Sequence, residues 1–240
     1  MIPDVEVVTT DNGLHYALFK TRDYISTSIR KYGHFEKKTQ ELARQFIKEG
    51  VVLDIGCNLG SFTIPLAKEF VNTRFVAFEP QRVVYQQFNA NIFLNSLTNV
   101  ESHNTGLAEK SMRLMGGVPD YKKSGNIGGL TLNFAIEQRR SNTLTGQFSR
   151  WDFLTTYDVK TLDDFNIRDI DLIKIDVEGM ELNVLIGAKQ TLVENNYPPI
   201  IFECWQDSWF EDQRTRLFSF LQEMGYSIQA QQKNNFLAVR

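Results

Sequence analysis

Acidic residues follow three apolar segments of the chain, at positions where short strands would end. Asp54 lies within the run Val51–Ile55, Glu79 follows Phe75–Phe78, and Asp176 ends a third run. Open α/β sheets bind ligands at the carboxyl ends of their parallel strands. Carboxylates at these positions would accept hydrogen bonds from a ligand that is bound there. We therefore expect the three acids to lie at one ligand-binding edge.

A glycine-bearing turn follows the first acid and predicts a close approach between backbone and ligand. Gly56 and Gly60 have no Cβ atom, so the backbone can turn sharply at both positions. The Gly-x-x-x-Gly spacing differs from the dinucleotide fingerprint, and it lacks the Lys-Ser/Thr pair of a phosphate-binding P-loop. A carboxylate at the tip of the next strand, Glu79, suits two adjacent ribose hydroxyls. The pattern predicts the nucleoside end of an S-adenosylmethionine site, with a nicotinamide site as the alternative.

Length and composition indicate a globular protein with a sizeable core. The chain has 240 residues, of which 42% are hydrophobic and 23% are charged, as in ordinary soluble domains. A net charge of −3 argues against a general nucleic-acid partner, which would need a basic face. The amino terminus lacks an apolar signal segment, and no apolar run reaches membrane-spanning length. We expect a cytoplasmic protein without membrane insertion, with Cys57 and Cys204 reduced.

The first fifty residues predict a small β/α extension. Residues 5–9 and 14–19 flank an Asp-Asn-Gly turn and predict a hairpin. Residues 23–35 have an irregular polar pattern, and residues 39–48 predict a helix that ends near Gly50. We treat residues 1–50 as this extension.

The remainder, residues 51–240, predicts one α/β domain. Strands and helices alternate as far as residue 224, including a helix that follows Met180 and ends at Asn195. Residues 226–230 and 236–239 then predict an antiparallel pair. The expected fold is a doubly wound, mostly parallel, seven-stranded, Rossmann-like sheet.

The stretch from residue 106 to residue 161 is the least regular part of this domain. It contains several glycines and few helical signals, and long excursions of this kind are often functional. Residues 130–134 predict an added strand. We expect this insertion to form the substrate side of the pocket, with a solvent-exposed excursion as the alternative.

Three motifs taken together closely resemble the FkbM family of S-adenosylmethionine-dependent methyltransferases. They are Val52–Thr63, Phe78–Pro80 and Leu172–Glu181, supported by Thr161–Asp164, and the resemblance covers about residues 33–205. It implies the class I methyltransferase fold with S-adenosylmethionine as the cofactor. Family members act mainly on hydroxyl groups of sugars and natural products. The resemblance therefore implies O-methylation of a small-molecule or glycan hydroxyl.

The resemblance also implies which residues bind the methyl donor. Asp54 would hold the methionine ammonium, directly or through water. Asn58 would hold the methionine carboxylate, and Glu79 the ribose hydroxyls. The tip of the third strand would frame the adenine. The complete expected set is Asp54, Gly56, Cys57, Asn58, Gly60, Ser61, Phe62, Glu79, Pro80, Thr105, Gly106, Leu107 and Asp176.

Three carboxylates are the candidates for acting on the acceptor. An alcohol must lose its proton as it attacks, and a positioned carboxylate can take that proton. Asp176 is the first candidate, as base or as substrate anchor, followed by Glu178 and Glu203. The same side chains offer oxygen ligands for a divalent metal. Their spacing matches no dedicated metal motif, so we do not favour a metal.

Six further side chains have either a structural or a functional interpretation. Lys174 lies inside an apolar strand and is expected to pair with a carboxylate, because a buried unpaired charge is costly. Glu181 is expected to stabilise a helix start. His34, in a lid, and His103 are alternative bases, although His103 is expected to be structural. Trp205 and its neighbour Trp209 suit either sugar stacking or core packing.

Two functions of other classes remain as rivals. The first is a nicotinamide-dependent oxidoreductase, which the glycine spacing and the terminal hairpin oppose. The second is a non-catalytic binding module that kept the fold, which the intact Asp54, Gly56, Gly60 and Glu79 oppose. A nitrogen acceptor is the alternative within the main class, and no oligomeric state is predicted.

Overall fold

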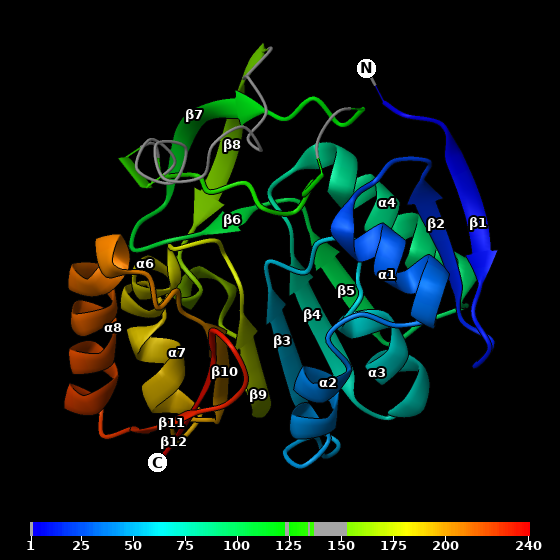
Figure 1. The fold of residues 1–240 in the computed structure, drawn as a ribbon. Helices are drawn as coiled ribbons and strands as arrows, with labels where there is room; N and C mark the ends of the chain where they lie inside the picture. The colour runs from blue at the N-terminus through cyan, green and yellow to red at the C-terminus, as the bar shows by residue number, and fades with distance from the viewer. Residues whose placement is uncertain (1, 123–124, 134, 137–152) are drawn as a thin grey trace.

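The centre of the molecule is a seven-stranded sheet with helices on both faces (Figure 1). The structure is a computed structural model that describes residues 2–122, 125–133, 135–136 and 153–240. In chain order the strands are β3 (Val51–Ile55), β4 (Arg74–Phe78), β5 (Val100–His103), β9 (Ile170–Ile175), β10 (Ile200–Glu203), β11 (Ser227–Ala230) and β12 (Asn235–Val239).

The order of these strands in the sheet is β11-β12-β10-β9-β3-β4-β5. The five strands from β10 to β5 are parallel, whereas β12 runs antiparallel to both β10 and β11. The expected mostly parallel, doubly wound sheet with a C-terminal antiparallel hairpin is therefore confirmed.

Strands β3 and β9 each carry a buried charged residue among apolar neighbours. All five residues of β3 are buried, as expected for a parallel strand that is covered on both faces. The parallel register places Asp54 of β3 opposite Lys174 of β9. Two buried opposite charges therefore face each other at the centre of the sheet.

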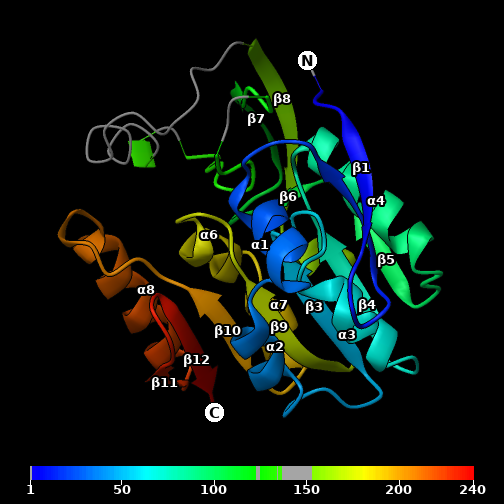
Figure 2. The same cartoon turned by 45° about the vertical axis from the view of Figure 1, so that its right-hand side comes forward.

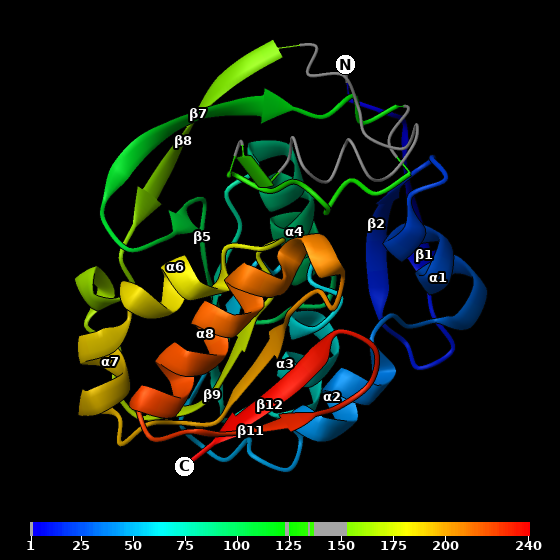
Figure 3. The same ribbon diagram turned by 60° about the vertical axis from the view of Figure 1, so that its left-hand side comes forward.

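Two layers of helices cover the sheet. On one face, α6 (Glu181–Ile186), α7 (Lys189–Glu194) and α8 (Glu211–Glu223) pack on β9, β10 and β12 (Figure 3). On the other face, α2 (Lys37–Ala43) and α3 (Thr63–Glu69) pack on β3, β4 and β9, with α4 (Arg82–Leu94) beside them. Helix α2 is shorter than the expected helix over residues 39–48.

The segment that we expected to be irregular contains helix α1 (Tyr24–Tyr32). Asp23 accepts a hydrogen bond from the backbone N–H of Ser26 and caps the helix start. Ile25 and Ile29, four residues apart, bury one face. Gly33, at a φ of 73°, ends the helix in the left-handed conformation. The expectation of an irregular segment was wrong. The Asp cap, the two isoleucines and the Gly stop that predict a helix are all present in the sequence.

The single helix expected after Met180 is two helices, α6 and α7. The break falls at Gly187, where a Cβ atom would lie 2.0 Å from the carbonyl oxygen of Ala108. This close approach between the helix end and the start of the insertion requires glycine. The expectation of one continuous helix was wrong because a distant segment sets the break.

The insertion is more regular than its sequence suggested. Strands β6 (Gly106–Leu107), β7 (Met112–Val118) and β8 (Phe153–Lys160) form a separate sheet with β8 in the middle. β8 pairs in parallel with β6 and antiparallel with β7. Figure 1 shows this small sheet above the main one. The strand expected over residues 130–134 is absent from 130–133, and Phe134 lies outside the described residues.

The N-terminal hairpin is confirmed as β1 (Val5–Thr9) and β2 (His15–Phe19), and it lies against α4 (Figure 2). Three amide side chains on one stripe of α4 hold the free edge of β2. Gln87 donates to the carbonyl of Ala17 at 2.8 Å, and Asn91 accepts from its N–H at 2.6 Å. Asn95 bonds both backbone groups of His15. These side chains take the place of a neighbouring strand, because they supply hydrogen-bond partners to the backbone of β2.

Among the described residues, no helix combines the length and the apolar character that crossing a membrane requires.

Replacement of Asn91 by alanine is expected to destabilise the protein strongly. Asn91 is fully buried, and its amide also donates to the carbonyl of Leu59, in the glycine turn, at 2.8 Å. The truncation leaves two buried backbone groups without partners, each costing about 1–3 kcal/mol. We expect the free energy of unfolding in urea to fall by about 2–4 kcal/mol. Exposed Asn72→Ala is the control, and an equal effect of both changes would contradict this role.

Candidate functional site

A cavity of about 240 Å³ lies where the carboxyl ends of the central strands meet the insertion. Its walls come from the turn after β3, the tips of β4, β9 and β10, and parts of the N-terminal extension and the insertion. Most of the expected donor-binding residues line it. They are Gly56, Cys57, Asn58, Ser61, Glu79, Pro80, Thr105, Gly106, Leu107 and Asp176.

The turn after β3 passes directly against the segment after β9. Gly56 has a φ of 82°, and a Cβ atom there would lie 1.9 Å from the carbonyl oxygen of Asp176. The N–H of Asp176 donates to the carbonyl of Ile55 at 2.9 Å. Only glycine combines this conformation with this contact, so Gly56 fixes the spacing between the two halves of the cavity floor.

Glu79 is a rigidly held carboxylate at the tip of β4. One oxygen accepts from the N–H of Gln81 at 2.8 Å, and the other accepts from the N–H of Asn58 at 3.1 Å. The side chain is 5% exposed. Burial raises the pKa of Glu79 to about 7, against the lowering effect of the two N–H donors. Each oxygen retains a lone pair that can accept from a ligand hydroxyl.

Three residues of the expected donor set lie behind the cavity wall. Asp54 is fully buried and accepts a 2.6 Å hydrogen bond from the hydroxyl of Thr63. Gly60 lies against the ring of Phe88, where a Cβ atom would approach to 2.5 Å. The ring of Phe62 lies behind the wall too. Within the described residues, these three support the glycine turn and do not line the cavity, and their expected part in donor binding stays a prediction.

The buried ammonium of Lys174 joins both sides of the site. Its Nζ lies 3.3 Å from a carboxylate oxygen of Asp54 and 3.6 Å from one of Asp176. It also donates to the carbonyl of Gly56 at 3.3 Å and lies 5.8 Å from the centre of the Phe62 ring. Burial alone would lower the pKa of Lys174, but the two carboxylates raise it above its ordinary value. The expected pairing of Lys174 with a carboxylate is confirmed.

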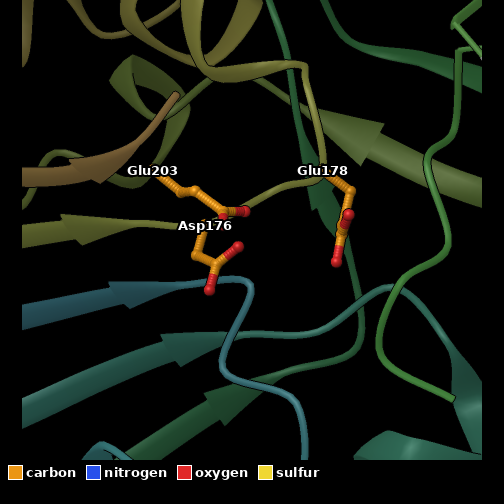
Figure 4. A group of neighbouring side chains, drawn as sticks. All are labelled: Asp176, Glu178 and Glu203. Carbon is orange, nitrogen blue, oxygen red and sulfur yellow. The ribbon is translucent and has the colours of Figure 1, made fainter. Parts of the chain in front are cut away.

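The three candidate catalytic carboxylates form one half-buried cluster. Oxygens of Asp176, Glu178 and Glu203 lie within 4.8 Å of one another. The side chains of Asp176 and Glu203 approach each other, and Glu178 extends from the loop that follows β9 (Figure 4). All three line the cavity. Hard oxygen ligands at this spacing can hold a cation or accept from a polar ligand.

Glu203 differs from its neighbours in protonation. Burial, together with the negative charges of Asp176 and Glu178, raises the pKa of Glu203 to about 10. It therefore carries a proton at neutral pH and can donate a hydrogen bond. Asp176, in contrast, lies beside the ammonium of Lys174, 3.6 Å from its Nζ.

Glu181 shapes the loop that presents this cluster. Its carboxylate accepts hydrogen bonds from the backbone N–H groups of Val177 and Gly179, both at 3.2 Å. The side chain is 2% exposed, and burial raises the pKa of Glu181 to about 7. Glu181 is the first residue of α6, so its position agrees with the expected role at a helix start.

Glu36 is a cavity residue that the sequence analysis did not select. It lies in the left-handed conformation at a φ of 52°, just before α2, and it lines the cavity. Burial, reinforced by the charge of Asp176 and opposed by Lys174, raises the pKa of Glu36 to about 7. No residue pattern marked this position, because the fold of the extension decides that it reaches the site.

The extension and the insertion supply further walls that were not predicted residue by residue. Residues before α2 and in α1 contribute one side, and a segment of the insertion contributes another. These residues are Tyr24, Ile25, Phe35, Asn126, Gly128, Leu130 and Leu132.

The alternative bases and the tryptophans lie elsewhere. His34 is exposed and lines a separate surface depression. His103 stacks on Phe78 at 5.1 Å and makes an edge contact with another ring. Trp205 is 9% exposed and packs with Trp209 in the main core cluster. These contacts support structural roles for His103 and for both tryptophans.

Replacement of Glu181 by glutamine is expected to flatten the pH dependence of stability. A carboxyl whose pKa rises from 4.5 to about 7 on folding binds more protons in the native state between these values. The free energy of unfolding therefore falls as pH rises from about 4.5 to about 7. We expect wild type to lose about 2 kcal/mol more than Glu181→Gln across this range in urea titrations.

Glu109→Gln, at an exposed position, serves as the control and should retain the wild-type slope. Equal slopes for Glu181→Gln and wild type would contradict the assigned protonation.

Several methyltransferases are similar to this chain. Methyltransferase sdnD of Sordaria araneosa is 27% identical over 201 residues, covering 74% of this chain and 73% of that protein. The 2-O-methyltransferase NoeI of Sinorhizobium fredii is 26% identical over 154 residues, covering 61% and 60%. Methyltransferase 1 of Beauveria bassiana is 27% identical over 150 residues, covering 59% of each chain. The chain thus spans about three fifths of the length of the last two.

Solved structures of other proteins are similar to this chain at low sequence identity. A putative rRNA methylase from Clostridium thermocellum is 14% identical, with a TM-score of 0.49, and the match covers 84% of this chain and 91% of that one. The model of the methyltransferase FkbM domain matches residues 54–228, from the centre of β3 into β11. Since this match includes the glycine turn, Glu79 and the carboxylate cluster, the chain belongs to the FkbM methyltransferase family.

Proposed function

We propose that this protein transfers a methyl group from S-adenosylmethionine to a hydroxyl of a sugar, a glycan or a glycosylated metabolite. One observation carries the proposal. The rigidly held carboxylate of Glu79 and the cluster of Asp176, Glu178 and Glu203 line one cavity. Membership of the family supports methyl transfer. In this proposal Glu79 marks the end of the cavity that binds the methyl donor, and the carboxylate cluster marks the end that binds the acceptor.

The walls of the cavity fit the donor. Glu79 offers two fixed oxygens to the ribose hydroxyls, and Leu107 offers an apolar surface to the adenine. The side chain of Asn58 points toward the insertion, close enough that a Cβ on Gly128 would lie 1.8 Å from its amide nitrogen. Cys57 and Ser61 line the same end, and Asp176 lies between donor and acceptor. S-adenosylmethionine, when bound, supplies an electrophilic methyl group on its sulfonium sulfur.

Asp54 supports donor binding indirectly in this proposal. Its oxygens face Thr63 and Lys174, so Asp54 holds the glycine turn in place. The backbone carbonyls and amides of that turn contact the methionine end of the donor. Glu36, which lines the cavity, is the better-placed carboxylate for the methionine ammonium.

At the acceptor end, Asp176 takes the hydroxyl proton as the oxygen bonds to the methyl carbon and the sulfur leaves as a thioether. Lys174 holds Asp176 in position. The protonated Glu203 donates a hydrogen bond that orients the acceptor. Alignment of oxygen, methyl and sulfur supplies much of the acceleration, and proton removal supplies the rest.

A hydroxyl acceptor is favoured over the alternatives. Several carboxylates side by side suit the many hydroxyl donors of a sugar, and the name of the 2-O-methyltransferase NoeI supports an oxygen acceptor. An amine acceptor stays the alternative within the family. The family match and the Gly-x-x-x-Gly turn oppose a nicotinamide-dependent oxidoreductase.

We propose that the reaction takes place in the cytoplasm and uses no metal. Cys57 and Cys204 are both buried and free, as expected for a reducing compartment. The ammonium of Lys174, 3.6 Å from Asp176, already opposes part of the negative charge of the cluster, which weakens the cluster as a divalent cation site. The insertion, residues 106–161, forms the substrate side in this proposal, and residues 1–50 act as an extension to the domain of residues 51–240.

Calorimetric titration with S-adenosylhomocysteine and S-adenosylmethionine tests the donor assignment. We expect micromolar binding to wild type and at least tenfold weaker binding to Glu79→Ala, because the ribose hydroxyls lose a charged acceptor. Glu109→Ala, at an exposed position, is the control. Binding of a nicotinamide dinucleotide in place of the adenosyl ligands would favour an oxidoreductase, and binding of neither would favour a non-catalytic module.

Methyl transfer to a panel of sugars and glycosides, with a labelled methyl donor, tests the acceptor assignment. We expect Asp176→Asn to lower kcat by about 10²–10⁴-fold, the usual contribution of a general base, while S-adenosylhomocysteine still binds. Activity should persist in a chelator. Loss of activity in chelator and its recovery with Mg²⁺ would instead assign a metal to the carboxylate cluster, and transfer to amines alone would overturn the hydroxyl assignment.

A further inference from the structure

One buried carboxylate connects the N-terminal extension to the insertion beside the cavity. Asp23 is 2% exposed. One of its oxygens accepts from the N–H of Ser26 at 2.9 Å and caps α1. The other accepts from the N–H of Ile127 at 3.0 Å, from a segment 104 residues further along the chain. The side chain of Asp23 thus accepts hydrogen bonds from α1 and from the insertion, and both of these elements line the cavity.

The backbone of Ile127 is held on both sides by side chains. Its N–H donates to Asp23, and its carbonyl accepts from the side-chain amide of Gln81 at 3.1 Å. Gln81 is 3% exposed, and its own N–H donates to the carboxylate of Glu79. Ile127 is itself buried, in a small apolar cluster with Phe19. These bonds replace the strand pairing that a buried backbone normally requires.

Gly128, the residue after Ile127, packs closely against the glycine turn. A Cβ atom on Gly128 would lie 1.8 Å from the amide nitrogen of Asn58, whereas a Cβ atom on Gly125 would meet no atom within 4 Å. Asn126, Gly128, Leu130 and Leu132 all line the cavity. The position of Ile127 therefore sets the position of the wall that the insertion contributes.

We propose that Asp23 is a positioning residue for donor binding, which holds the insertion segment 126–132 against the glycine turn through the amide of Ile127. This role rests on the proposed function, because it assumes that the cavity binds the adenosyl donor. It extends that function to a carboxylate that lies outside the cavity wall and acts through the segment it holds.

The two roles of Asp23 can be separated by the choice of substitution. Serine is a good helix N-cap, but its shorter side chain cannot serve Ser26 and reach Ile127 at the same time. Asp23→Ser therefore keeps α1 and releases the insertion. Asp23→Ala removes both roles. Asp11→Ser, at an exposed turn residue, controls for the loss of one negative charge.

Calorimetry with S-adenosylhomocysteine and amide hydrogen exchange give independent readouts. For Asp23→Ser we expect the Kd to rise about tenfold at an unchanged stoichiometry, as for one lost hydrogen bond to a charged group. Exchange of the Ile127 amide should accelerate in the same variant without ligand. A residue needed only for folding would instead lower the stoichiometry or the Tm and leave the Kd unchanged.

A second pair of variants tests the same wall from the opposite side. Gly128→Ala must displace either the segment or the Asn58 side chain, which both form the cavity wall, and is expected to weaken S-adenosylhomocysteine binding. Gly125→Ala should bind as wild type. Wild-type affinity in both Asp23→Ser and Gly128→Ala would overturn the positioning role, as would an unprotected Ile127 amide in wild type. If Asp23→Ser fails to fold, the proposal is tested by two other measurements. These are the affinities of Gly128→Ala and Gly125→Ala for S-adenosylhomocysteine, and the hydrogen-exchange rate of the Ile127 amide in wild type.

The outcomes also distinguish this inference from the function on which it rests. Wild type that binds S-adenosylhomocysteine, with Asp23→Ser binding equally well, would leave the proposed function intact and remove the role of Asp23. Wild type that binds no adenosyl ligand would remove both.

Discussion

The buried ammonium of Lys174 is the interaction on which the site depends. It lies between Asp54 and Asp176 and also bonds the carbonyl of Gly56, so it joins the ends of the two central strands. Removal of one partner from such a buried group would leave an uncompensated charge, which is far more costly than loss of a surface ion pair. The glycine turn and the carboxylate cluster are therefore held in one geometry by one cation.

That arrangement gives the carboxylates of the cavity different surroundings. Asp176 lies beside the cation, whereas burial and like charge keep a proton on Glu203. Glu79 is separated from this cluster and is held by backbone N–H groups instead. Carboxyl groups in one cavity thus acquire different chemical roles, because their surroundings move their pKa values apart.

The sheet and its ligand-binding edge were predictable from local patterns. Continuous apolar runs predict buried parallel strands, and the residues that follow β3, β4 and β9 must lie at one edge whatever else the chain does. The prediction failed where the signal was not local. The break at Gly187 depends on Ala108, and the pairing of β7 with β8 joins segments far apart in the sequence. Helix α1 was missed although its Asp cap and Gly stop were present.

The fold class, the family and most residues of the cavity floor were predictable from the chain alone, because these follow from periodicity and from motifs within short stretches. The tertiary structure was needed to place Asp54 and Glu36. It turns Asp54 toward Thr63 and Lys174 and brings Glu36 into the wall. It also places Asp23 beside Ile127. The physical reason is that side-chain direction and contacts between distant segments are set by packing, which no local pattern of residues encodes.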